Sequence, residues 1–280
     1  MIDSSMKMHS AAHGAGSWTS VALGLAFAGA LLAGCAGVPG ADGAGQSAEI
    51  TTESDEPPAR RRARIRLELA VGYFEQGRTE IALDEVKQAL LADPTYAAAF
   101  NLRGLVYMRL NDMRQAEDSL RRAIALDPRD SDAHHNYAWL LCQQGRFDES
   151  LRTFRQALAN PLYGGRAKTY MGQGLCEARA GRTADAEQSL ARSYELDAAN
   201  PVTGYNLAAL LLARGELQRA QFYIRRLNNS ELANAESLWL GIRVEDRVGD
   251  RVARDQLADQ LRRRFPQSRE LALFEKGNFQ

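Results

Sequence analysis

The sequence predicts an all-α fold, a solenoid of about six helical hairpins that ends in a short capping helix. Three observations predict it. Apolar residues recur three and four positions apart, which gives each helix one apolar face. A turn residue recurs at intervals of 34 residues, with one interval of 36, and a small residue usually follows five positions later. The turn residues are Gly77, Asn111, Gly145, Gly181, Gly215 and Gly249.

A period of 34 residues built from two helices and a turn is the signature of the tetratricopeptide repeat. It predicts a right-handed superhelical solenoid of about six repeats over residues 60–266. An irregular helical bundle is the alternative, but it does not explain six turn residues at nearly constant spacing. The second unit is the clearest, and its signature residues are Phe100, Gly104, Tyr107, Ala116, Leu120, Ala123 and Pro128.

Residues 1–34 precede the repeats and are predicted to be a lipoprotein signal peptide. Their apolar run, residues 21–32, is too short to span a bilayer comfortably. It ends in Leu32-Ala33-Gly34-Cys35, which resembles the bacterial lipobox, so Cys35 is the expected lipidation site. An ordinary cleaved signal with a stray cysteine is the alternative. The residue after Cys35 is Ala36, not aspartate, and by resemblance to Gram-negative lipoproteins this favours an outer-membrane, lipid-anchored location facing the periplasm.

Residues 35–59 are rich in Gly, Ala, Ser, Thr and acidic residues, which predicts a flexible tether.

Within the repeats, the second helix often ends in a proline step, as at Asp93-Pro94 and Asp127-Pro128, because proline cannot continue a helix. The fourth repeat departs from this pattern, since its proline comes late, at Pro201. Residues 267–280 form the predicted C-terminal capping helix, with Ser268 as its N-cap.

The three cysteines agree with a periplasmic location. If Cys35 carries lipid, Cys142 and Cys176 remain as a pair on the first helices of neighbouring repeats three and four. The periplasm is oxidising, so we expect a disulfide between them. Two buried reduced cysteines are the alternative.

The sequence contains no recognisable catalytic or metal-binding constellation, so we expect neither an enzyme nor a cofactor. The formal net charge is zero, which gives no general attraction to nucleic acid. His134 and His135 are adjacent on a helix, and they therefore point in directions too different to share a metal ion. A small-molecule substrate is not expected either.

The remaining candidate for function is a surface. The first helix of each repeat is expected to line the concave side, where apolar strips commonly bind partners. Some of these side chains are expected to pack between repeats instead, and convex faces are also open to partners. The predicted groove residues are Phe74, Leu105, Met108, His135, Trp139, Gln143, Met171, Leu175, Tyr205 and Leu212.

Strings in the central repeats make the chain similar to a specific family. Asn136-Tyr137, the segment 141–147, the segment 160–163 and Gly174-Leu175-Cys176 resemble the type IV pilus biogenesis and stability lipoproteins PilF and PilW. The resemblance implies a pilotin, which helps a PilQ-like secretin reach the outer membrane and multimerise there. A general periplasmic adaptor lipoprotein, for example one that gathers peptidoglycan enzymes, is the alternative.

Overall fold

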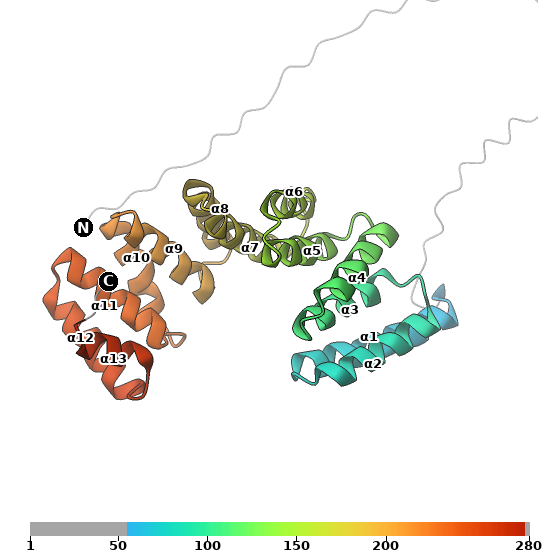
Figure 1. Ribbon diagram of the computed structural model, residues 1–280, viewed down its shortest axis with the longest axis horizontal. Coiled ribbons are helices and arrows are strands. Elements are labelled where there is room, and N and C mark those ends of the chain that lie inside the picture. The colour runs from blue at the N-terminus through green and yellow to red at the C-terminus, as the bar shows by residue number, and fades with distance from the viewer. Residues whose placement is uncertain (1–54, 278–280) are drawn as a thin grey trace, which may run out of the picture. The chain divides into compact units, whose positions relative to one another are not determined.

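The computed structural model describes residues 55–277, and within this range the secondary structure is helical with no strand (Figure 1). The predicted signal peptide, the lipidation site at Cys35 and most of the tether lie outside the described residues. The helices are α1 (Pro58–Glu75), α2 (Thr79–Ala92), α3 (Ala97–Arg109), α4 (Met113–Leu126), α5 (Ser131–Gln143), α6 (Phe147–Leu158), α7 (Arg166–Arg179), α8 (Thr183–Leu196), α9 (Pro201–Ala213), α10 (Leu217–Asn228), α11 (Ala235–Val248), α12 (Arg251–Arg264) and α13 (Arg269–Glu275).

Each odd-numbered helix up to α11 forms a hairpin with the helix that follows it, so the described residues contain six repeats. The hairpin turns lie at the six residues that the sequence pattern predicts, and all six have positive φ. At the third turn φ of Gly145 is 75°, and the next backbone N–H, that of Arg146, donates to the Leu141 carbonyl at 2.9 Å. This arrangement is a Schellman cap, which satisfies carbonyl groups at the end of a helix.

The turn at Asn111 is the exception among these positions, because φ is 61° at a residue that is not glycine. Asparagine enters the left-handed region more readily than other side chains do. The adjacent Asp112 then caps α4, since its side chain accepts from the Gln115 backbone N–H at 3.1 Å.

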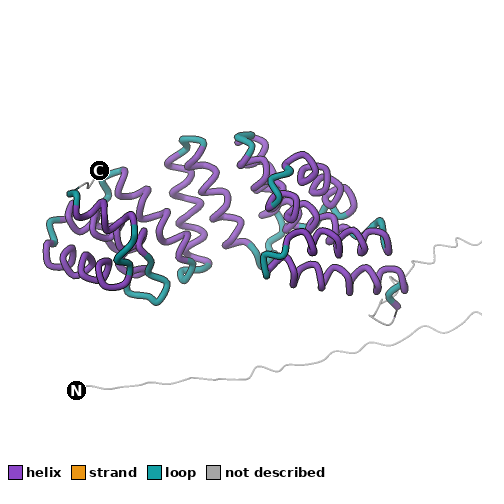
Figure 2. The backbone as a smooth tube through the Cα atoms, turned by 60° about the horizontal axis from the view of Figure 1, so that its bottom comes forward, coloured by secondary structure: helices purple, strands orange, loops and turns teal. Residues whose placement is uncertain are grey.

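Consecutive repeats stack through their odd-numbered helices. α1 contacts α3, α3 contacts α5, and the series continues to α11, whereas successive even-numbered helices do not contact each other. Helices that are closer together from repeat to repeat lie on the inner side of a curved stack. The odd-numbered helices therefore form the inner side of the solenoid, and Figure 2 shows the succession of hairpins.

Small residues allow the two helices of a hairpin to approach. A Cβ atom added to Gly104 of α3 would lie 2.5 Å from Leu120 Cγ of α4, which is far closer than van der Waals contact. Ala116 and Ala123, at signature positions of the same hairpin, have no solvent exposure. The core is thus a series of interlocking small and large side chains, one set per hairpin.

The last hairpin is covered as predicted. Ser268 caps α13 by accepting from the Leu271 backbone N–H at 3.2 Å, and Leu271 is buried against Leu238 and Leu261. At the other end, the first helix begins at Pro58, two residues before the predicted start of the repeats. Proline is favoured in the first turn of a helix because its missing N–H has no partner there in any case.

No helix within residues 55–277 combines the length and the apolar character that crossing a membrane requires. The same part of the chain has no cluster of three or more side chains that is suited to a metal ion.

Candidate protein-binding surface

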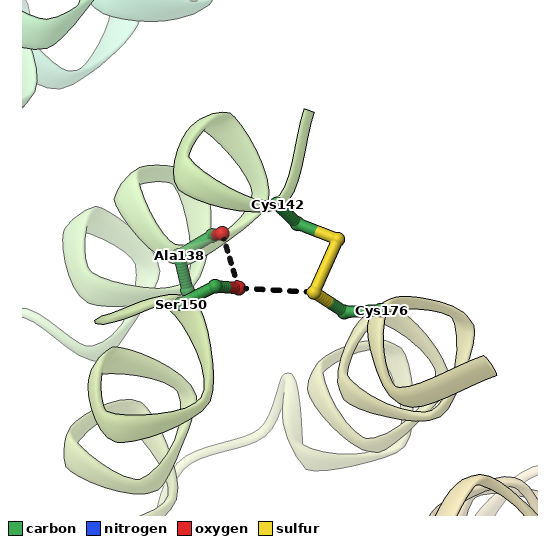
Figure 3. The surroundings of a disulfide bond; sticks show 4 residues. All are labelled: Ala138, Cys142, Ser150 and Cys176. Carbon is green, nitrogen blue, oxygen red and sulfur yellow. Dashed lines mark hydrogen bonds between the residues drawn. A yellow bond between two sulfur atoms is a disulfide. The ribbon is translucent and has the colours of Figure 1, made fainter. Parts of the chain in front are cut away.

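A disulfide joins the third and fourth repeats in the structure. Cys142 near the end of α5 and Cys176 in α7 have Cα atoms 5.8 Å apart, within the range that a disulfide spans (Figure 3). Ser150 of α6 donates to the Ala138 carbonyl at 2.7 Å, and its Oγ lies 3.3 Å from Cys176 Sγ. The bridge therefore connects two inner helices that line the predicted groove.

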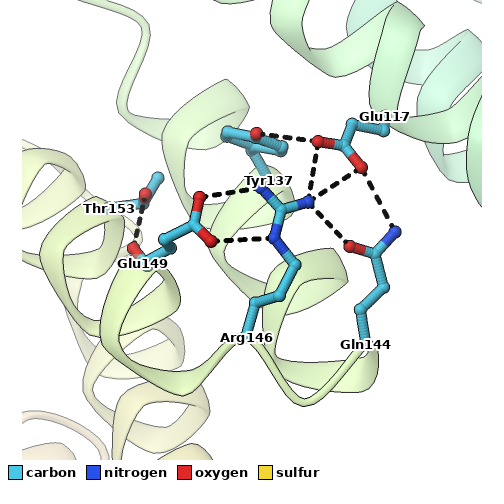
Figure 4. Close-up of polar contacts among 6 residues, drawn as sticks. All are labelled: Glu117, Tyr137, Gln144, Arg146, Glu149 and Thr153. Atoms are coloured by element: carbon cyan, nitrogen blue, oxygen red, sulfur yellow. Dashed lines mark hydrogen bonds and ion pairs between the residues drawn. The ribbon is translucent and has the colours of Figure 1, made fainter.

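A partly buried ion pair joins the second and third repeats (Figure 4). Arg146, in the turn between α5 and α6, donates to both carboxylate oxygens of Glu117 on α4, at 2.8 and 3.0 Å. Tyr137 and Gln144 also donate to this carboxylate, at 3.2 and 3.3 Å. Burial alone would raise the pKa of Glu117, but the bonds from Arg146 and Gln144 outweigh it and hold the pKa below its ordinary value.

The fourth and fifth repeats are joined in a similar way. Glu187 of α8 forms ion pairs with Arg214, at the end of α9, and with Arg219 of α10, the second at 2.7 Å. Only 15% of the Glu187 side chain is exposed. Together with the disulfide, these contacts link repeats two to five through side chains that are distant in sequence.

The inner helices carry a row of half-buried apolar side chains, which we call the inner strip. All are partly exposed, and all except Met171 also pack on the core clusters of their repeats. Because neighbouring inner helices are in contact, the row runs from repeat to repeat. The inner strip consists of Phe74, Met108, Trp139, Met171 and Tyr205. Leu105 and Leu175 are also half-buried, and Gln143 is exposed.

Two predicted groove residues are buried instead. His135 is 6% exposed, its Nδ1 lies 3.0 Å from Thr169 Oγ1 of α7, and its ring meets Phe154 edge to face. Burial lowers the pKa of His135 to about 3, Lys168 adds to the effect and Asp132 opposes it, so the imidazole is neutral. Leu212 is 7% exposed and belongs to the core of the fifth repeat. Both contribute to packing between and within repeats.

Two arginines cover aromatic rings of the inner strip: Arg179, which the repeat pattern places in the predicted groove, and Arg109, which the groove prediction missed. The Arg109 guanidinium lies 3.6 Å from the centroid of the Phe74 ring and also donates to the Phe74 carbonyl. Arg179 lies 5.1 Å from the centroid of Trp139. Both occupy the last turn of an inner helix, where the helix dipole favours a cation. The strip therefore combines apolar surface with positive charge.

Comparison with known proteins now places the chain in a family. One tetratricopeptide-repeat family model matches three overlapping segments, residues 67–131, 102–167 and 135–201, and a second matches residues 201–221. Together they span more than half of the chain. The chain is a tetratricopeptide-repeat protein. This family consists of protein-interaction scaffolds, and the solenoid described above is its fold.

Two relatives are more informative than the repeats alone. The chain is 29% identical over 209 residues to the type IV pilus assembly protein PilF of Pseudomonas aeruginosa, a match that covers 75% of this chain and 83% of PilF. The solved PilF structure superimposes with a TM-score of 0.71 at 27% identity, covering 79% of this chain and 100% of that one.

The crystal structure of PilW, described as a widely conserved type IV pilus biogenesis factor, superimposes with a TM-score of 0.70 at 29% identity, covering 76% of this chain and 97% of PilW. A tetratricopeptide-repeat protein of Thermus thermophilus shares 23% identity with a TM-score of 0.54, covering 66% of this chain and 98% of the other, and shows the fold alone. The chain is thus homologous to PilF and structurally similar to PilW, and its homologues support a role in type IV pilus biogenesis.

Proposed function

We propose that this protein is a pilotin: an outer-membrane lipoprotein that binds the type IV pilus secretin and promotes its localisation and multimerisation. The observation that carries the proposal is the similarity to PilF and PilW over about three quarters of the chain. The family resemblance supplies the secretin as partner, and the lipobox ending in Cys35 supplies the anchor.

In this mechanism, acyl chains on Cys35 hold the protein at the inner leaflet of the outer membrane, and residues 36–57 give the solenoid reach. Several acyl chains anchor a protein stably, whereas one does so only marginally. The inner strip holds an unassembled secretin subunit, and tethering raises the local concentration of that subunit at the membrane. The pilotin itself makes and breaks no bond.

The chemistry of the inner strip defines the segment that it binds. Trp139 and Phe74 offer large apolar contacts, and Arg179 and Arg109 beside them offer positive charge. Aromatic side chains and arginine are the residue types that contribute most to binding energy in interfaces. The bound secretin segment is therefore one in which apolar residues are accompanied by acidic ones.

Variants of the inner strip test this proposal. The double substitution Trp139→Ala with Met108→Ala removes two half-buried side chains of the strip, and we expect it to abolish multimerisation of the secretin while the protein stays folded by circular dichroism. The matched control is Phe222→Ala, an exposed aromatic residue of α10. Normal secretin multimers with the double variant would contradict the assignment of the strip as the binding site.

The anchor is tested separately. The Cys35→Ala variant is expected to leave the protein and the secretin together outside the outer-membrane fraction. If the secretin reaches the outer membrane normally with this variant, the protein is an adaptor for another client, and the pilotin proposal is wrong.

A further inference from the structure

One side of α1 carries an apolar stripe that no described helix covers. Among the helices of residues 55–277, α1 contacts only α2 and α3, and its hairpin is the first in the succession (Figure 1). Ile65 and Leu69, one helical turn apart, are 49% and 46% exposed. Gly72 continues the stripe, and a Cβ atom added to it would meet nothing within 4 Å. The stripe therefore borders open space.

In the later repeats, the position equivalent to Ile65 packs against the preceding hairpin. Ile65 lies twelve positions before its turn residue Gly77, and the residues at this place in the other repeats have no solvent exposure. Thr169, for example, has its hydroxyl group 3.0 Å from His135 Nδ1 of the preceding repeat. The equivalent residues are Ala99, Ala133, Thr169, Thr203 and Ser237. The stripe is thus the stacking face of a repeat with no described predecessor.

The size of Ile65 argues against a further hairpin on this face. Where a hairpin does stack, the equivalent position holds alanine, serine or threonine, because the packed helices leave little room there. Isoleucine is larger than any of these, and overpacking of this kind disfavours a stacked hairpin. A second copy of the chain that extended the solenoid from this end would meet the same obstacle. A flat surface is a better occupant.

Positive charge flanks the stripe at the start of α1. Arg61 and Arg62 are exposed and form no ion pair with any residue of 55–277, whereas the other three arginines of the helix pair with carboxylates. Of the two acidic residues of α1, Glu68 pairs with Arg64, and Glu75 lies in the last turn, away from this end. Unpaired cations beside an apolar stripe suit the anionic head groups of a phospholipid surface.

We propose that this end face of α1, which consists of Arg61, Arg62, Ile65, Leu69 and Gly72, rests on the anionic phospholipid surface to which the lipid on Cys35 attaches the protein. The inference rests on the proposed anchor and adds an orientation to it. Residues 36–57 separate Cys35 from α1, and a flexible chain of that length has a root-mean-square span of roughly 25 Å. The anchor keeps the end face at high local concentration beside the membrane, so a contact too weak to bind alone is sufficient.

This orientation leaves the inner strip open. Phe74, the strip residue of α1, comes nine positions after Ile65, which places it on the opposite side of the helix. It packs with Ala70 and Val86 in the core of the first hairpin. Contact between the end face and lipid therefore does not cover Phe74, and the later repeats extend away from the membrane.

Methyl NMR of the mature lipoprotein in nanodiscs tests the orientation. The Ile65 methyl group reports on the end face, and the Leu232 methyl groups, on a side chain that is 52% exposed, are the reference. The discs contain phosphatidylethanolamine, phosphatidylglycerol and a lipid with gadolinium on its head group. We expect the Ile65 signal to be lost and the Leu232 signals to remain. Loss of both or of neither would overturn the proposal, and equal loss of Ile65 in neutral phosphatidylcholine discs would overturn the assignment to anionic head groups.

Two double variants locate the contact. Each arginine near an anionic surface strengthens the contact about fivefold, so Arg61→Gln with Arg62→Gln is expected to weaken it about 25-fold and to restore the Ile65 signal. Arg152→Gln with Arg155→Gln, at exposed positions of α6, changes the net charge equally and is expected to leave the Ile65 signal lost. Loss of that signal in both double variants would overturn a contact through Arg61 and Arg62.

The intact mass of the purified lipoprotein separates this proposal from that of the anchor. If the mass shows no acyl chains, the anchor and the orientation are both wrong. If acyl chains are present and the Ile65 signal is unaffected by the gadolinium lipid, the anchor stands and the orientation alone is wrong.

Discussion

At the scale of single residues, the inner helices provide packing and, in the proposed function, recognition. His135 illustrates the first role, because its ring is held between Thr169 and Phe154 and its pKa is lowered to about 3. Trp139, four positions later on the same helix, illustrates the second role, because it is half-buried and faces Arg179. One helical turn thus separates a core residue from a surface residue.

The lowered pKa of His135 predicts a dependence of stability on pH. A histidine with a depressed pKa is protonated more readily in the unfolded chain, so its neutral form contributes stability above pH 6.5 that is lost as pH falls toward 3. Between pH 7 and pH 5 the loss is about 2 kcal/mol at most. Urea unfolding at both pH values measures it, and the His135→Gln variant is expected to show a smaller loss. An equal loss in the variant would contradict the burial of a neutral His135.

Gly104 gives a second prediction at this scale. The Gly104→Ala substitution places a Cβ atom 2.5 Å from Leu120 Cγ, and such overpacking costs about 1–3 kcal/mol, partly offset by about 1 kcal/mol of helix propensity. The control is Gly72→Ala in α1, where the added atom meets nothing within 4 Å, and it is expected to stabilise the protein. Thermal unfolding compares the two. If Gly104→Ala is as stable as Gly72→Ala, α3 and α4 do not pack as closely at Gly104 as described above.

At the scale of elements, the contacts between repeats explain how hairpins that are unstable alone form one solenoid. The disulfide ties α5 to α7, and Glu117 ties α4 to the α5–α6 turn. In each case a residue of one repeat reaches a residue of the next, which is the nearest-neighbour coupling that repeat proteins depend on.

The disulfide closes a loop between residues 34 apart, which corresponds to about 3–4 kcal/mol of stabilisation in the chain-entropy account. In the double variant Cys142→Ser with Cys176→Ser, we expect the free energy of unfolding measured in urea to fall by that amount. Intact-protein mass after alkylation without reductant is the direct check on the pairing. Two alkylated thiols on these positions would show that the cysteines are reduced.

The ion pair at Glu117 is expected to matter more than its exposed counterpart. The Glu117 side chain is only 20% exposed, and Glu117→Gln replaces its charged hydrogen bonds with Arg146 by weaker neutral ones. We expect the free energy of unfolding to fall by about 1–2 kcal/mol. Glu149, which is 46% exposed, also pairs with Arg146, and Glu149→Gln is the control, for which we expect a much smaller change because solvent screens an exposed pair. Similar losses for both variants would contradict a special role for the less exposed Glu117 carboxylate.

Much of the fold could be predicted from the sequence because its signals are local. Each turn needs a residue that tolerates positive φ, and Ser268 followed by an apolar run predicts the capping helix. The surface was harder to predict, since it depends on contacts between repeats. His135 is buried against Thr169 in the next repeat, and Arg109 reaches Phe74 from 35 residues away.

At the scale of the whole molecule, the proposed pilotin combines a membrane anchor, a tether and a repeat solenoid that holds a client protein. The disulfide and the partly buried carboxylates of Glu117 and Glu187 link repeats two to five to one another. The inner strip runs along this part, so a bound segment meets a surface with a fixed shape. Preorganisation of this kind reduces the entropy lost on binding.

The most direct test of the central claim is the amount of multimeric secretin in outer-membrane fractions of cells with and without this protein. The pilotin account predicts that multimers disappear from the outer membrane, or remain in the inner membrane, when the protein is absent. Unchanged multimers in the outer membrane would contradict it and would mean that the solenoid serves a different client.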